Sequence, residues 1–315
     1  MWKNYRLYYV VFIFLLLSIV LIGCQKAPEE VEEYNEDVKQ DAIDTGESNY
    51  IQKITPVTVI IDNHANARPQ SGLQEATFVY EFLVEGGITR FLAVFDTLPE
   101  EMFIIGPVRS LRPYFAHQAC EYSGIVAHAG YSKKTAEEIK DLQIKHIAGS
   151  SYFYRDSSRK APHNLYTDSK KLFEAEVGTV GPINTAISLP VLPSGYNEGN
   201  QIEISYRRNN KVSYKYSEDY QAYLRFINEN PHVDRDSGLQ YAPRRVILRQ
   251  TEHINIPNSP LLSIDLSGEG EGMLFEKGRQ YEIYWIKENN ETTYYYTDGT
   301  PVDLSYANTW IQVVP

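Results

Sequence analysis

The run Val57-Thr58-Val59-Ile60-Ile61-Asp62-Asn63-His64 decides the fold of this chain. Its first five residues form a short continuous strand-forming stretch, which predicts a buried β-strand. The run changes from apolar to polar at Asp62, so we expect the strand to end there. Because ligands tend to bind beyond the ends of strands in α/β sheets, this boundary also marks a candidate site.

The residues that follow this strand predict a mixed α/β domain over residues 53–188. Two more buried strands come next, and two helical segments come after them, each preceded by residues that favour a helix start. The expected strands span residues 76–83 and 91–95, and the expected helices span residues 133–142, after Ser132, and 169–175, after Thr167 and Asp168.

The second half of the chain has a different pattern. Proline and glycine crowd between residues 189 and 199, which is typical of a domain boundary. Beyond it, stretches such as 202–204 and 281–286 alternate between apolar and polar residues, and Lys277-Gly278 is a hairpin-turn signal. We therefore expect residues 200–315 to form a smaller, mostly antiparallel β domain, and the fold class to be α+β.

The N-terminus has the form of a secretion signal. Lys3 and Arg6 precede a stretch of 16 largely apolar residues, 7–22. A membrane-spanning helix needs roughly 20 apolar residues, so this length favours a cleaved signal peptide over residues 1–23. The alternative is a permanent N-terminal anchor. Either one places residues 25–315 on the outer face of the cytoplasmic membrane, because the basic flank stays inside.

The end of this leader, Leu21-Ile22-Gly23-Cys24, resembles the lipobox of bacterial lipoproteins. The resemblance implies cleavage before Cys24 and a diacylglyceryl thioether on its sulfur, which would anchor the protein to the membrane. Cys120 is the other cysteine of the chain, so lipidation of Cys24 leaves no pair for an intramolecular disulfide.

The charge distribution predicts a tether and limits the partners. Residues 25–52 hold nine acids against two lysines, which is the composition of a disordered segment, so we expect residues 24–52 to form a lipidated acidic tether. The whole chain carries a net charge of −11, and residues 53–315 carry −6. Nucleic-acid binding through a general basic surface is therefore not expected. A local cluster of arginines can still bind an anion.

Candidate ligand-binding residues gather at the predicted strand ends and in the loop that follows Gly106-Pro107. Arg109 and Arg112 stand three residues apart at a predicted helix start, where planar guanidinium groups suit a phosphate or carboxylate. The alternative is that these arginines pair with Asp62, Glu81 and Glu85 in a buried ionic network that holds strand ends together. The candidates are Asp62, His64, Arg68, Glu81, Glu85, Arg90, Arg109 and Arg112.

Two further candidates, His128 and His163, lie near loop signals, where a histidine can act as a general base or simply form hydrogen bonds. The histidines show no tight spacing such as H-x-x-x-H, and no cysteine ligands are available, so we expect no metal and no cofactor. The chain also lacks a G-x-S-x-G motif, a Walker loop and a G-x-G-x-x-G motif, which removes the usual support for those enzyme classes.

Several long strings carry a family resemblance. They are residues 61–73, 81–95, 106–114, 153–156, 161–166 and 309–315. These strings resemble the YerB-like lipoproteins, domain of unknown function 3048, over residues 53–315. The resemblance implies a two-domain, lipid-anchored envelope protein of Gram-positive, Firmicutes-type bacteria, and it supplies no set of catalytic residues.

A fainter similarity concerns the LytR-CpsA-Psr phosphotransferases, which act on polyprenyl-phosphate-linked glycopolymers. A strand followed by Asp62, then Arg68, then a strand that ends before Arg109 is somewhat similar to that family. Ser110 stands where an aspartate is expected, and Pro69 and Gln70 follow Arg68 in place of Ser-Asp. These departures weaken the case for metal-assisted transfer and leave anion binding open.

Two classes of function therefore compete. The first is a non-catalytic binding or adaptor protein for an anionic envelope ligand or a membrane protein partner. The second is an envelope enzyme of the phosphotransferase type. The missing catalytic motifs favour the first, and the arginines with their neighbouring acids favour the second.

Overall fold

The computed structural model describes most of the chain beyond the predicted tether. The described residues are 50–97, 101–122, 124–149, 151–174, 179–184, 192–207, 210–259, 261–305 and 307–315. The predicted signal peptide, Cys24 and the tether up to residue 49 lie outside the described residues, as do residues 189–191 of the predicted domain boundary.

Strand β1 (Tyr50–Asp62) contains the buried run that the sequence predicts. It pairs antiparallel with β3 (Thr89–Thr97) and parallel with β5 (Ile125–Ala127). Its residues from Val57 to Ile61 are buried, which confirms the predicted buried strand. The register places Asp62 opposite Arg90, so the polar end of β1 meets a charged residue of its neighbour.

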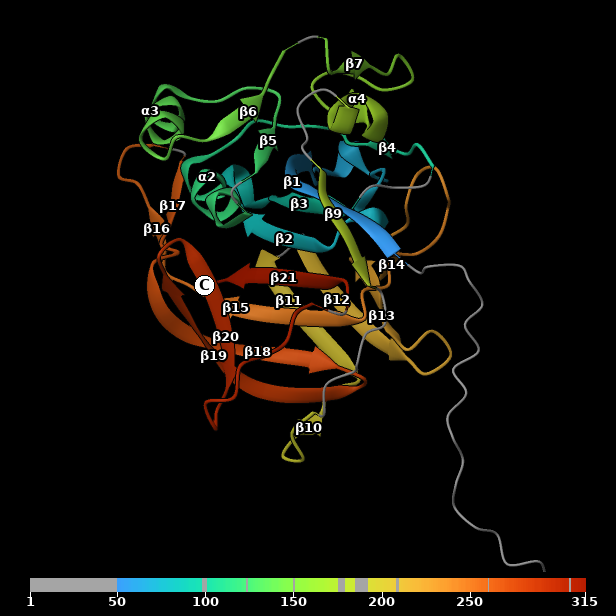
Figure 1. Ribbon diagram of the computed structural model, residues 1–315, viewed down its shortest axis with the longest axis vertical. Coiled ribbons are helices and arrows are strands. Elements are labelled where there is room, and N and C mark those ends of the chain that lie inside the picture. The colour runs from blue at the N-terminus through green and yellow to red at the C-terminus, as the bar shows by residue number, and fades with distance from the viewer. Residues whose placement is uncertain are drawn as a thin grey trace, which may run out of the picture. The chain divides into compact units, whose positions relative to one another are not determined.

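One sheet of twelve strands runs through both halves of the chain (Figure 1). Strand β21 (Thr309–Val314) lies parallel between β2 (Phe78–Leu83), from the first half, and β15 (Arg245–Gln250), from the second half. The last strand of the chain therefore joins the two halves. The other strands of this sheet are β6 (Lys145–Ile147), β9 (Thr179–Asn184), β10 (Asn197–Glu198), β18 (Gly268–Glu276), β19 (Arg279–Glu288) and β20 (Glu291–Tyr296).

The two faces of the large sheet are covered by different layers. One face packs against helices α2 (Pro113–Ala119) and α3 (Lys133–Asp141). The opposite face packs against a separate four-stranded sheet. Because successive side chains of a strand point to opposite faces, one strand can contribute to both cores. The strands of the second sheet are β11 (Gln201–Arg207), β12 (Asn210–Ser217), β13 (Ala222–Ile227) and β14 (Asn230–Pro231).

Smaller elements complete the described part of the chain. Strands β4 (Ile104–Ile105), β7 (Tyr154–Arg155) and β8 (Leu165–Asp168) form a three-stranded sheet, β16 (His253–Asn255) pairs with β17 (Leu262–Ile264), and α4 (Ser169–Glu174) follows β8. Short 3-10 helices span Ala65–Ala67, Leu73–Glu75, Glu85–Gly87 and Cys120–Tyr122. Among the described helices, none combines the length and apolar character that crossing a membrane requires.

The fold is sheet-rich, and the described helices lie before residue 190. Helix α3 begins where the sequence predicts, because Ser132 is its N-cap and its Oγ accepts a hydrogen bond from the Thr135 N–H at 3.2 Å. The division into domains 53–188 and 200–315 stays a prediction. The structure adds that one continuous sheet takes strands from both segments.

Candidate functional site

Asp62, at the end of β1, is the centre of a polar cluster. Its side chain is fully buried and interacts with three groups. Oδ1 accepts a hydrogen bond from the His64 N–H at 3.0 Å. Oδ2 lies 2.7 Å from Nδ1 of His163 and 3.1 Å from Nε of Arg109. A buried carboxylate with this many partners is held in place, because each partner compensates part of the cost of burying it.

Backbone hydrogen bonds fix the segments that carry these side chains. The N–H of Asp62 donates to the Pro107 carbonyl at 2.8 Å, and the N–H of Arg109 donates to the Ile60 carbonyl at 2.8 Å. The Arg159 guanidinium donates to the carbonyls of Ala67 and Pro69 at 2.6 and 2.7 Å, which ties the loop of His163 to the loop of Arg68. The peptide bonds before Pro69, Pro107 and Pro162 are cis. The hydrogen bonds between these segments fix the segments of the cluster against one another.

His64 and His163 stack face to face, with ring centroids 4.5 Å apart and an angle of 14° between the planes. The Asn66 N–H donates to Nδ1 of His64 at 3.1 Å, so the neutral His64 ring carries its proton on Nε2. Nδ1 of His163 faces the Asp62 carboxylate, so in the neutral tautomer of His163 the proton lies on Nδ1 and the lone pair on Nε2. Burial, and then the neighbouring His163 ring, lower the pKa of His64, which favours its neutral form.

Arg109 keeps part of its guanidinium free. Its Nε lies 3.1 Å from Oδ2 of Asp62, close enough for an ion pair but without the geometry of a hydrogen bond. Nη1 and Nη2 make no hydrogen bond or ion pair with the described residues. The Arg109 side chain is 21% exposed, so these two donors can reach a ligand from solvent. Arg68 lies beside the cluster and donates from Nε and Nη2 to the Asn63 side chain and carbonyl at 3.0 and 2.8 Å.

Arg90, opposite Asp62 on β3, is a buried cation with other charged groups around it. Burial and the neighbouring cations Arg112 and Arg109 lower the pKa of Arg90 to about 10, outweighing the acids Glu85 and Asp62. Its Nη1 donates to the Ser110 carbonyl at 3.0 Å, and its Nε is buried without a partner. Arg90 is therefore a buried cation with both arginines and acids as its neighbours.

Arg112 and Arg109 pair with different acids in the structure. Arg112 forms a two-point contact with Glu85, from Nε to Oε1 at 2.6 Å and from Nη2 to Oε2 at 3.1 Å. This pair also lowers the pKa of Glu85, against the effect of burial. Both arginines pair with acids that the ionic-network alternative names, Arg112 with Glu85 through two nitrogen atoms and Arg109 with Asp62 through Nε alone.

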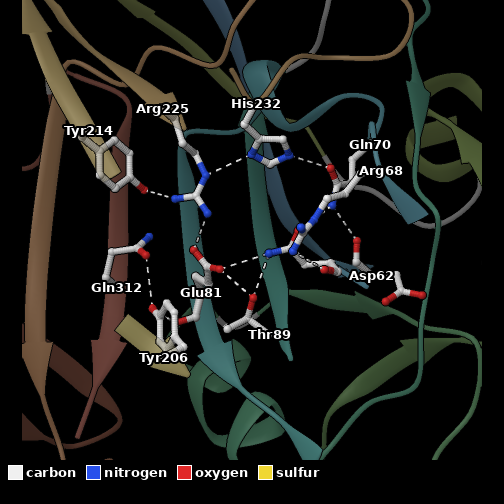
Figure 2. A network of polar contacts seen from close by, with 11 residues as sticks. Asp62, Arg68, Gln70, Glu81, Thr89, Tyr206, Tyr214, Arg225, His232 and Gln312 are labelled. Atoms are coloured by element: carbon white, nitrogen blue, oxygen red, sulfur yellow. Dashed lines mark hydrogen bonds and ion pairs between the residues drawn. The ribbon is translucent and has the colours of Figure 1, made fainter. Parts of the chain in front are cut away.

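Glu81 lies at the buried centre of a network that Figure 2 shows, and Asn63 connects it to Arg68 beside the Asp62 cluster. Its Oε2 accepts a hydrogen bond from Nη2 of Arg225, on β13, at 2.7 Å, and both side chains are 0% exposed. Oε1 accepts from Asn63 and Thr89 at 3.1 and 2.6 Å. Arg225 also donates to Nδ1 of His232 at 3.0 Å. This network holds the two sheets together and offers no open donor to a ligand.

Sequence reasoning missed Arg225 and His232, although β13 carried a signal. Tyr223, Arg225 and Ile227 alternate along this strand, and each is buried. An arginine on the inward face of a strand must find an acid partner, because an unpaired buried charge is costly. The sequence alone did not show that this partner is Glu81, 144 residues earlier.

His128 lies outside the Asp62 cluster. Its Nε2 is 3.2 Å from Nδ1 of His146, the two rings stack, and the Gly130 N–H donates to Nδ1 of His128 at 3.2 Å. Burial, and then His146, lower the pKa of His128 to about 4. The side chain is 0% exposed, which suits a structural hydrogen bond more than a general base. No group of three or more metal-ligating side chains occurs among the described residues.

Two cavities that border candidate residues are not lined by Asp62, His64, Arg109 or His163. A groove of about 540 Å³ runs between α2, α3 and the β16–β17 hairpin and is lined by Glu85 and Arg112, but by none of Asp62, His64, Arg109 and His163. A smaller cavity of about 290 Å³ borders Arg68. We place the candidate site at Asp62, because partly exposed charged and polar groups with free nitrogen atoms meet there.

Comparisons with known proteins agree with one another. Two family models match, both described as protein of unknown function (DUF3048), the N-terminal domain over residues 44–179 and the C-terminal domain over residues 202–311. A curated relative, "Putative lipoprotein YerB" of Bacillus subtilis (strain 168), is 32% identical over 285 residues, which are 84% of this chain and 83% of the relative. The crystal structure of YerB protein from Bacillus subtilis matches with a TM-score of 0.72 and 30% identity, over 84% of this chain and 92% of that chain.

Proposed function

The chain belongs to the YerB-like family defined by the N-terminal and C-terminal DUF3048 domains, and we propose that it is a lipid-anchored envelope protein. From the geometry of the Asp62 cluster we propose further that it binds an anionic group there. The anchor is Cys24, at the end of the leader, on the outer face of the cytoplasmic membrane. The relative's name as a lipoprotein supports this part of the proposal. The acidic residues 25–49 serve as the tether between the lipid and the folded part of the chain. Residues 50–52, which the sequence pattern assigned to the tether, belong instead to strand β1, where they pair with β9.

One observation carries the binding proposal: Nη1 and Nη2 of Arg109 have no partner among the described residues, while its Nε forms an ion pair with the buried Asp62 at 3.1 Å. A guanidinium held in this way presents two parallel donors, which match two oxygens of a phosphate or carboxylate. Nε2–H of His64 adds a neutral donor beside them. Fixing the donors in advance lowers the entropic cost of binding.

The anchor narrows the choice of ligand. Polyprenyl phosphates, teichoic acids and muropeptides all carry phosphate or carboxylate groups and occur where a lipoprotein of the outer face would meet them. An adaptor role toward a membrane protein partner is compatible with the same site. A phosphotransferase of the LytR-CpsA-Psr type stays a prediction.

A thermal-shift screen of the purified protein with these three classes of ligand tests the proposal. We expect at least one class to raise the melting temperature, and Arg109→Ala to remove that increase. Arg112→Ala should keep it, because Arg112 is already neutralised by Glu85. The matched control is Arg244→Ala, which removes an exposed arginine that does not belong to the cluster. Equal shifts for the parent and Arg109→Ala would refute binding at this site.

A further inference from the structure

We infer that His163 is a general base and that the Asp62 cluster hydrolyses or transfers phosphodiesters. This inference rests on the proposed anion binding and adds a reaction to it. The starting observation is the 2.7 Å contact between Nδ1 of His163 and Oδ2 of Asp62, a carboxylate that is itself 0% exposed. A histidine oriented by a buried carboxylate holds one tautomer, with its other nitrogen ready to accept a proton.

The free nitrogen of His163 points to an accessible position. Nε2 makes no hydrogen bond with the described residues, and the His163 side chain is 14% exposed although Nδ1 faces a fully buried group. The stacked ring of His64 covers one face of the imidazole and limits its rotation. Nε2 is therefore a basic atom with a fixed direction at the surface of the cluster, which is the geometry that general-base catalysis requires.

Arg109 selects the class of substrate. It meets the same carboxylate oxygen as His163, so an anion on its free nitrogens lies close to the imidazole. A simple carboxylate would bind there but is a poor electrophile. A phosphodiester offers both an anionic oxygen for Arg109 and a phosphorus atom that a hydroxyl group can attack. Positive charge from Arg109 would stabilise the charge that develops on the phosphoryl oxygens.

The step balances without a further reactant. Nε2 of His163 takes the proton of a water molecule or an alcohol as its oxygen forms a bond to phosphorus. The bond between phosphorus and the leaving oxygen breaks, and that oxygen departs with the electron pair and receives the proton from His163. Asp62 stabilises the imidazolium in between. With water the products are a phosphate monoester and an alcohol, and with an alcohol they are a new phosphodiester and the leaving alcohol.

The test uses the full-length protein in mild detergent with bis(4-nitrophenyl) phosphate and follows release of 4-nitrophenol. We expect turnover by the parent and a loss of at least about 100-fold in kcat for His163→Gln, the lower end of what general-base catalysis contributes. His117→Gln is the matched control, because His117 is a 44% exposed histidine outside the cluster. It should keep the parental rate.

A second variant separates a catalytic role from a structural one. His163→Gly should lose turnover and regain part of it when free imidazole is added, which a residue needed only for folding would not show. No turnover by the parent, or an unchanged kcat for His163→Gln, overturns the inference. If the parent shows a ligand-induced thermal shift but no turnover, the proposed binding stands and the catalytic step is wrong. If the parent shows neither, both are wrong.

Discussion

Removal of Arg225 tests how the two sheets are held together. Arg225→Met keeps a long side chain on β13 but leaves Oε2 of Glu81 without its partner at 2.7 Å, in a site where both side chains are 0% exposed. Breaking a buried ion pair by removing one partner costs about 3–5 kcal/mol, because the remaining charge has no compensation. We therefore expect the free energy of unfolding to fall by about that amount.

Contacts between Arg225 and neighbouring aromatic rings also stabilise the folded state. The guanidinium lies over the rings of Trp310, Tyr214 and Phe91, with centroids at 4.9, 5.1 and 5.6 Å. Contacts of this kind contribute about 0.5–2 kcal/mol when they are desolvated. The methionine side chain retains apolar contact with these rings and loses the electrostatic part. The loss of the Glu81 partner is the larger effect.

Urea-induced unfolding of the purified protein measures this change, and two variants serve as controls. The double variant Glu81→Gln with Arg225→Met should recover part of the loss, because no buried charge remains. Arg235→Met removes the partly exposed pair with Asp156 and should cost no more than about 1 kcal/mol. A fall of less than about 1 kcal/mol in the free energy of unfolding for Arg225→Met would falsify this account of how the two sheets are held together.

Three further predictions follow from other groups. Burial lowers the pKa of His128 to about 4, below the value of about 6.5 in the unfolded chain, so unfolding binds a proton between these values. The stability is therefore complete above pH 6.5 and is lost as the pH falls toward 4, by at most about 1.4 kcal/mol per pH unit. His128→Asn should flatten this slope in urea titrations at several pH values, and an unchanged slope would contradict the assignment. For the anchor, Cys24→Ala should abolish incorporation of labelled lipid and block signal cleavage, and labelling that survives the change would refute lipidation at Cys24. For the neutralised pair, Glu85→Gln should release Arg112 and increase binding of an anionic ligand measured by thermal shift, and a weaker shift would show that Glu85 itself contacts the ligand.

The sequence predicts the local parts of this structure well. The buried run of β1, the end of that strand at Asp62 and the Ser132 cap of α3 depend on neighbouring residues, and each is where the pattern places it. The ionic alternative was also visible, because Arg112 pairs with Glu85, one of the acids expected to neutralise it. These features need no knowledge of how distant segments meet.

The pairing of distant segments is what the sequence does not show. His163 follows Asp62 by 101 residues, and Arg225 follows Glu81 by 144. Each pair depends on the sheet order, in which β21 returns to lie between β2 and β15 and brings the second half beside the first. The sequence also grouped Arg109 with Arg112, three residues apart, whereas the structure gives them separate acid partners.

The central claim is that Arg109 binds an anion through its free nitrogens, and calorimetric titration tests it most directly. The titrant is a glycerol-phosphate teichoic-acid fragment, added to the parent protein, to Arg109→Ala and to the Arg244→Ala control. A hydrogen bond to a charged group contributes about 1.5–3 kcal/mol, so we expect Arg109→Ala to raise Kd about 10-fold to 150-fold. Arg244→Ala should leave Kd unchanged. The same Kd for the parent and Arg109→Ala would contradict the claim.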